Sequence, residues 1–142
     1  MKTLFLASAI MLSSTSARSA DFKLEDIKQI VCDSTVRYEK DSPNDKTTVR
    51  GIKIFTPGSR NDVGPRPGAF LLAEYQLRDD AMTVFDNQQF YFKPINDGKL
   101  SFEFIASWKS EGVLQLGQNN TASGFINSKD HITELSCALV LK

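Results

Sequence analysis

The sequence contains only one histidine and two cysteines, and this scarcity argues against several common kinds of site. Ordinary zinc sites need three or four histidine and cysteine ligands, which His131, Cys32 and Cys137 do not supply at the usual spacings. Serine and cysteine nucleophiles normally act beside a histidine base, and His131 lies in the turn-like stretch of residues 128–131. The chain also lacks a Gly-x-Ser-x-Gly motif and a phosphate-binding loop. We therefore expect no catalytic residue, no metal and no cofactor.

An excess of charge of either sign is also missing, with 17 basic and 17 acidic residues in the whole chain. Nucleic-acid binding relies on a basic face that neutralises phosphates, so no nucleic-acid partner is expected. Paired carboxylates can form a hydrolase site, and Glu74, Glu103 and Glu134 each lie within a predicted strand. We predict all three on the face opposite to the core, as solvated charges. A hydrolase with an unrecognised carboxylate pair remains an alternative.

The N-terminus is the one long apolar stretch: residues 3–12 follow a lysine and precede small and polar residues up to position 20. This order is typical of a secretory signal peptide, and the stretch is shorter than the roughly 20 residues that span a bilayer. We predict a signal peptide over residues 1–19, cleaved between residues 17 and 20, and a single β domain over residues 20–142. Cleavage removes Lys2 and Arg18 and no acidic residue, which leaves a formal charge of −2. The mature chain is expected to be exported, periplasmic or secreted, without a transmembrane segment.

Alternation of apolar and polar residues dominates the rest of the chain and predicts an all-β domain. The clearest strand, residues 100–108, follows the hairpin signal Asn96-Asp97-Gly98. A second hairpin is expected around Asn119-Asn120. Further strands are predicted over residues 29–39, 47–56, 69–77, 82–93, 112–118, 121–127 and 132–141, which makes about eight in all. Residues 22–31 suggest a short N-terminal helix, with strand as the alternative for the second half.

The same alternation predicts which side chains face the core. Residues 47–56 are expected to turn Val49, Ile52 and Ile54 inward, with a bulge at Gly51 where the alternation slips. Residues 69–77 are expected to do so through Leu71, Ala73, Tyr75 and Leu77. The long stretch 82–93 is predicted to bend or split at Asp86-Asn87.

The two cysteines lie near opposite ends of the domain, on the apolar faces of the first and last predicted strands. In an exported protein an even number of cysteines indicates a disulfide, with two free thiols as the alternative. A Cys32–Cys137 bond requires the first and last strands to meet, and in an up-and-down antiparallel order they meet only when the sheet closes. We therefore predict a small up-and-down β-barrel, with a two-sheet β-sandwich as the alternative.

Two features are candidate binding sites. The segment Pro57–Gly68 joins two strands with more residues than the connection needs, and loops of this length are often functional. Its candidate binding residues are Arg60, Asn61, Asp62 and Arg66; a tolerated insertion is the alternative. The second candidate is the barrel lumen, which in an eight-stranded barrel is either filled by side chains or holds one small ligand. The lumen residues are expected to be Tyr75, Phe92, Phe102, Phe104 and Trp108, with filling favoured.

The order of predicted elements resembles that of small periplasmic eight-stranded barrels, which include bacterial lysozyme inhibitors. Thr121-Ala122-Ser123-Gly124 resembles the Ser-Ala-Ser-Gly stretch of that inhibitor family. The match covers four residues; Asn127 stands where the family carries a tyrosine, and the strand with Trp108 precedes the stretch instead of following it.

Together these features predict an exported, non-enzymatic binding module of the cell envelope or secreted space. An inhibitor-like role is one form of this prediction. Its partner is an unknown protein or small molecule. The first alternative is a small apolar-ligand carrier that uses the lumen, and the second is the hydrolase.

Overall fold

The structure, a computed structural model, describes residues 22–38, 48–58, 66–78, 81–104 and 110–142, without the side chains of residues 78 and 85–87. A single turn of 3-10 helix, η1 (Leu24–Asp26), precedes the strands. The strands are β1 (Ile27–Tyr38), β2 (Thr48–Pro57), β3 (Ala69–Arg78), β4 (Ala81–Phe92), β5 (Lys99–Phe104), β6 (Glu111–Leu116), β7 (Thr121–Asn127) and β8 (His131–Leu141).

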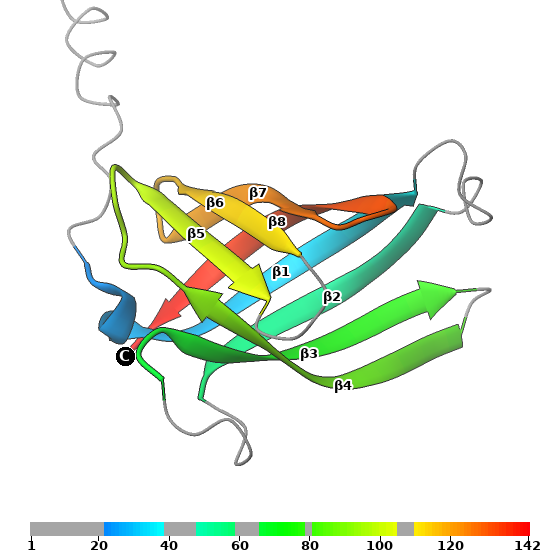
Figure 1. Cartoon of the computed structure of the whole chain (residues 1–142), viewed down its shortest axis with the longest axis horizontal. Coiled ribbons are helices and arrows are strands. Elements are labelled where there is room, and N and C mark those ends of the chain that lie inside the picture. The colour runs from blue at the N-terminus through cyan, green and yellow to red at the C-terminus, as the bar shows by residue number, and fades with distance from the viewer. Residues whose placement is uncertain (1–21, 39–47, 59–65, 79–80, 105–109) are drawn as a thin grey trace, which may run out of the picture.

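The eight strands form a closed barrel in which each pairs antiparallel with its neighbours in sequence, and β8 returns to β1 (Figure 1). The predicted up-and-down barrel is confirmed, and the sandwich alternative is wrong. Closure satisfies the backbone hydrogen-bonding groups that an open sheet leaves at its edges. Of the short helix suggested within residues 22–31 only the single turn η1 is present, and the strand alternative for the second half is confirmed, because β1 begins at Ile27. No helix in the described ranges has the length and apolar character needed to cross a membrane.

The contact between β1 and β8 carries the disulfide. Cys32 lies directly opposite Cys137 in the strand register, with their Cα atoms 3.9 Å apart and their sulfur atoms bonded. Both side chains face the interior, at 0% and 5% exposure. The predicted Cys32–Cys137 disulfide is confirmed. Such bonds are typical of proteins from oxidising compartments.

Phenylalanine rings fill one half of the barrel. Phe55 lies at the centre and meets Phe90, Phe92 and Phe102 edge-on, with ring centroids 5.5, 5.5 and 5.9 Å away. Phe92 and Phe102 stack on each other with centroids 4.8 Å apart. Edge-to-face and offset contacts of this kind add to the free energy gained by burying the rings. This half of the barrel is therefore a packed core.

The predicted facing is right for β1, β5 and β8 and wrong for most of β2 and β3. On β2, Ile52 faces outward at 37% exposure, while Lys53 and Phe55 face inward. On β3, Phe70, Leu72 and Glu74 are buried, so Leu71, Ala73, Tyr75 and Leu77 belong to the outer face. The alternation on these strands is misleading because the outer face carries apolar side chains such as Ile52 and Leu77, while the inner face includes the charged Lys53 and Glu74.

Two predicted irregularities have different outcomes. At Gly51 there is no bulge, since the β1–β2 register runs without a break from Ile30 opposite Phe55 to Arg37 opposite Thr48. The glycine is needed for a different reason: a Cβ here would collide with the backbone carbonyl oxygen of Tyr75 on β3. At Asp86-Asn87 the predicted bend is confirmed as a bulge, where β4 places two residues opposite one on β3.

Both predicted hairpins are confirmed. Asp97 and Gly98 have φ values of 52° and 68°, and the backbone groups of Asn96 and Lys99 bond each other across the turn at 3.1 and 3.0 Å. Asn119 and Asn120 have φ values of 54° and 56°. Glycine, asparagine and aspartate tolerate positive φ better than other residues, so the local sequence favours both turns.

Candidate functional site

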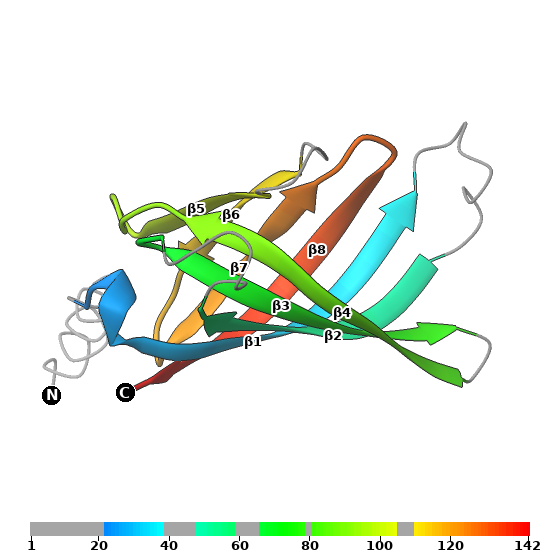
Figure 2. The same cartoon turned by 60° about the horizontal axis from the view of Figure 1, so that its bottom comes forward.

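η1, the end of β8 and the β4–β5 turn lie at the same end of the barrel (Figure 2). A pocket of about 820 Å³ is found there. Its walls come from segments distant in sequence. η1 and its neighbours form one wall. Residues 57–58 and 66–68, at the two ends of the β2–β3 connection, form another, and the end of β4 with the following turn forms the third. The volume falls in the range of small-molecule binding pockets.

The wall from the β2–β3 connection is held by backbone hydrogen bonds. Gly58 N donates to the carbonyl of Ala69 at 3.0 Å, and Ala69 N donates to that of Arg66 at 3.1 Å. Phe92 N donates to the carbonyl of Gly68 at 2.7 Å, which ties this wall to β4. Gly68 has a φ of 79°, and a Cβ there would run into the backbone of Phe92, so both conformation and space require glycine.

η1 forms the adjoining wall, and one backbone hydrogen bond connects it to the end of the chain after β8. Lys23 N donates to Oδ2 of Asp26 at 2.8 Å, while Lys142 N donates to the Asp26 carbonyl at 2.9 Å. Leu24, partly buried, packs against the core and also lines the pocket. The turn is therefore connected to the end of β8 through Asp26 and to the core through Leu24.

The floor of the pocket is the apolar end of the core. Ile27, Phe70 and Phe92 are at most 2% exposed and still contribute to the lining. Tyr91 and Ile95 are half-buried on the β4–β5 side. Pro57, Pro67 and Pro94 add rigid apolar surface near the mouth.

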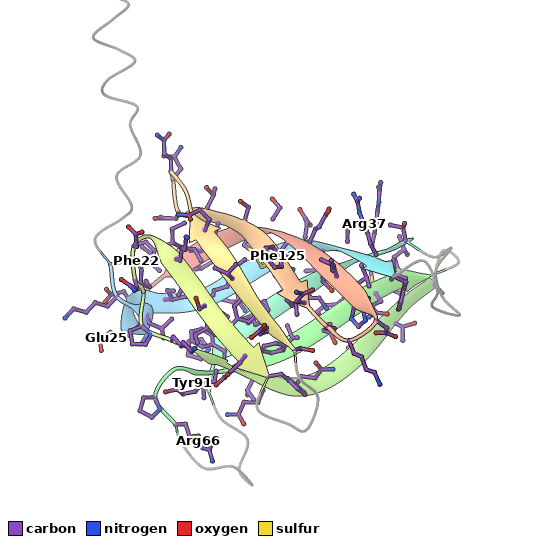
Figure 3. The ribbon with its side chains drawn as sticks, turned by 45° about the horizontal axis from the view of Figure 1, so that its top comes forward. Phe22, Glu25, Arg37, Arg66, Tyr91 and Phe125 are labelled. Carbon is purple, nitrogen blue, oxygen red and sulfur yellow. A yellow bond between two sulfur atoms is a disulfide. The ribbon has the colours of Figure 1, made fainter. Side chains whose placement is uncertain are left out.

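Charged side chains of both signs surround this apolar floor. Lys23, Arg66 and Lys142 supply positive charge, and Glu25 and Asp97 supply negative charge. Figure 3 shows Phe22, Glu25, Tyr91 and Arg66 at the same end of the barrel, with Arg37 at the far end. The two ion pairs and the His131–Asp130 contact found among the described residues join other side chains, so none of these five is held by a described salt bridge.

The structure brings only part of the predicted loop to this site. Arg66 is exposed and lines the pocket, as do Pro57, Gly58, Pro67 and Gly68. Arg60, Asn61 and Asp62 lie outside the described residues. The contributions of η1 and the β4–β5 turn could not be seen in the sequence, because only closure of the barrel brings these segments to the β2–β3 connection.

The predicted lumen residues have three outcomes. Phe92 and Phe102 are buried at 1% and 2% exposure inside the packed cluster, and Phe104 packs on it with its ring centroid 5.3 Å from that of Phe90. Tyr75 was assigned wrongly, because odd-numbered residues of β3 after Ala69 face outward. Trp108 lies outside the described residues.

A buried ion pair in the interior was not anticipated. Lys53 and Glu74 are directly opposite each other on β2 and β3, form a salt bridge and are 5% and 8% exposed. The prediction that Glu74 lies on the outer face is therefore wrong. Burial lowers the pKa of Lys53 to about 8. The pair continues the cross-strand row of the disulfide, since Cys32 lies opposite Lys53.

The other acidic residues considered from the sequence are exposed, as predicted. Glu134 contacts Arg37 at 3.3 Å on the outer surface. Glu103 lies opposite Glu111 on β5 and β6, and both are exposed away from the pocket. His131 begins β8 at the surface turn, where its Nδ1 lies 2.6 Å from Oδ1 of Asp130; this hydrogen bond lowers the pKa of the Asp130 carboxyl.

No protein-family model matches the chain, and comparisons with curated proteins and with solved structures find no significant similarity. The stretch resembling lysozyme inhibitors, Thr121–Gly124, is paired on both sides within β7 and does not line the pocket.

Proposed function

We propose that the protein is an exported, non-enzymatic binding module whose ligand or partner engages the pocket at the η1 end of the barrel. The observation that carries this proposal is the pocket itself: an apolar floor backed by the packed core, walls held by hydrogen bonds, and a rim of mixed charge. Most small-molecule sites combine a preformed apolar cavity with a few polar groups that orient the ligand. The disulfide and the predicted signal peptide support the exported part of the proposal.

The two alternatives have less support. A ligand inside the lumen would compete with the phenylalanine cluster, which already fills the half of the barrel below the pocket. A hydrolase would need two carboxylates facing one substrate. Glu74 is instead occupied by Lys53, while Glu103 and Glu134 lie on the outer face.

The test fills the pocket without unfolding the barrel. Ile95→Trp adds a large side chain to the pocket wall, and Ile132→Trp makes the same change at a 43% exposed position near the other end. The immobilised mature chain is exposed to an envelope extract of its native host, and bound small molecules and proteins are identified by mass spectrometry. Ile95→Trp should abolish capture, whereas Ile132→Trp should leave it unchanged.

A second pair of variants tests the rim. Arg66→Ala should weaken capture and reduce its dependence on salt, because rim charges act mainly on the rate of encounter. Arg37→Ala, at the far end of the barrel, should have no effect. Undiminished capture by both Ile95→Trp and Arg66→Ala would contradict the proposed site.

A further inference from the structure

The apolar and polar groups of the pocket at the η1 end occupy different parts of its lining. Phe70 and Phe92 belong to the inner face of the barrel, and together with Ile27 they form the apolar floor. Tyr91 lies between the buried Phe90 and Phe92 on β4, so its half-buried side chain belongs to the outer face. The lining therefore passes from the apolar end of the core to the outer face of β4.

Arg66 and Tyr91 form the polar part of the lining. Ala69 N donates to the Arg66 carbonyl at 3.1 Å, and Ala69 lies directly opposite Tyr91 in the β3–β4 register. Figure 3 shows Arg66 and Tyr91 on the same side of this barrel end. Neither side chain has a hydrogen-bond or ion-pair partner in the part of the chain that the structure describes. A guanidinium and a phenolic O–H both donate hydrogen bonds, and an arginine fork matches the two oxygens of a carboxylate.

The distribution of charge among the walls favours the same place for an anion. Glu25 lies on η1 together with Lys23, Lys142 follows β8 beside them, and Asp97 lies in the β4–β5 turn. The wall from the β2–β3 connection carries one charge in its described residues, that of Arg66. It is therefore the wall on which an anionic group meets a cation and no carboxylate among those residues.

We propose that the pocket binds a single-chain amphiphile with a carboxylate head group, such as a medium-chain fatty acid. Arg66 and Tyr91 bind the carboxylate, and the alkyl chain lies against Phe70, Phe92 and Ile95. The phenylalanine cluster fills the barrel beyond the floor, so the chain stays at the barrel end and does not enter the lumen. This inference rests on the proposed function, because it names the ligand of the same site.

Isothermal titration calorimetry of the oxidised mature chain tests the chemistry of the ligand. The probes are hexanoate, octanoate and decanoate below micelle-forming concentrations, with 1-octanol as the uncharged comparison. Each methylene added to the chain should lower the dissociation constant roughly 4-fold, because it removes more apolar surface from water. Octanoate should bind at least about 10-fold more tightly than 1-octanol, since a charge-assisted hydrogen bond holds only the carboxylate.

Variants of the head-group residues separate the two parts of the ligand. Arg66→Gln should weaken octanoate binding at least about 10-fold and change 1-octanol binding less than about 2-fold, because the alkyl chain keeps its contacts. Tyr91→Phe should weaken octanoate binding about 10-fold, through the loss of one hydrogen bond to a charged group. The matched control is Arg37→Gln, which removes an exposed cation at the far end of the barrel and should change neither affinity. Circular dichroism checks that each variant is folded.

The outcomes distinguish this inference from the proposed function. Equal affinities for octanoate and 1-octanol, an Arg66→Gln effect that is the same for both, or an equal loss in Arg37→Gln would overturn the carboxylate assignment. So would the absence of any carboxylate binding while Ile95→Trp still abolishes capture from the envelope extract, a result that leaves the proposed function standing. Octanoate binding and capture that both survive Ile95→Trp would instead place the ligand outside the pocket and overturn both.

Discussion

Replacing Lys53 by methionine leaves Glu74 buried at 8% exposure without the cation that now contacts it. Methionine fills a similar volume, so the change removes the charge without opening a large cavity. Breaking a buried pair from one side typically costs about 3–5 kcal/mol, because an uncompensated charge is left in a low-dielectric interior. We expect Lys53→Met to lower the free energy of unfolding by that amount.

Removing both partners should reverse the loss. A buried ion pair gains little beyond the cost of removing its two charges from water, and apolar replacements of similar volume are often neutral or stabilising by about 1–4 kcal/mol. The double variant Lys53→Met with Glu74→Leu should therefore be at least as stable as wild type. Urea unfolding, followed by circular dichroism, measures the free energy of unfolding of four oxidised proteins: wild type, Lys53→Met, Glu74→Leu and the double variant. These four values complete the double-mutant cycle. A loss below about 1 kcal/mol for Lys53→Met would refute the reasoning.

Two further predictions concern the core and the N-terminus. Phe55→Ala, at the centre of the ring cluster, should lower the free energy of unfolding by about 3–5 kcal/mol, while Phe125→Ala, 43% exposed on the outer face, should cost less than about 1 kcal/mol; similar losses in urea unfolding would contradict the packing. N-terminal sequencing of the exported protein should find a first residue between Arg18 and Asp21, and an intact Met1 would contradict the predicted signal peptide.

The sequence predicts the barrel well because several of its strands bury one apolar face and expose one polar face. On β8, Leu135, Cys137 and Leu139 are buried between exposed residues, so period two identifies both strand and orientation. On β2 and β3 the same rule fails. Their outer face carries Ile52 and other apolar side chains, and their inner face includes the Lys53–Glu74 pair, so hydropathy points to the wrong side.

Only one segment of the candidate site can be recognised from the sequence. Pro57–Gly68 is long and rich in proline and glycine, and its ends do line the pocket. The remaining walls come from segments that are distant in sequence, and no local sequence pattern indicates that these segments lie close together in the fold. Leu24 and Ile95 each look like ordinary apolar residues near a turn, and they meet at one pocket only because the closed sheet brings η1 beside the β4–β5 turn.

The disulfide also determines how the protein responds to a pulling force. Tension applied to the two ends of the chain passes directly from Cys32 to Cys137, so the strands between them bear no load while the bond is intact. Reduction transfers the load to the hydrogen bonds that join β1 and β8. Their rupture releases the 105-residue separation between the cysteines, about 350 Å of extended chain. The oxidised barrel is in effect inextensible between these two points, and a reductant turns it into a domain that force can unravel.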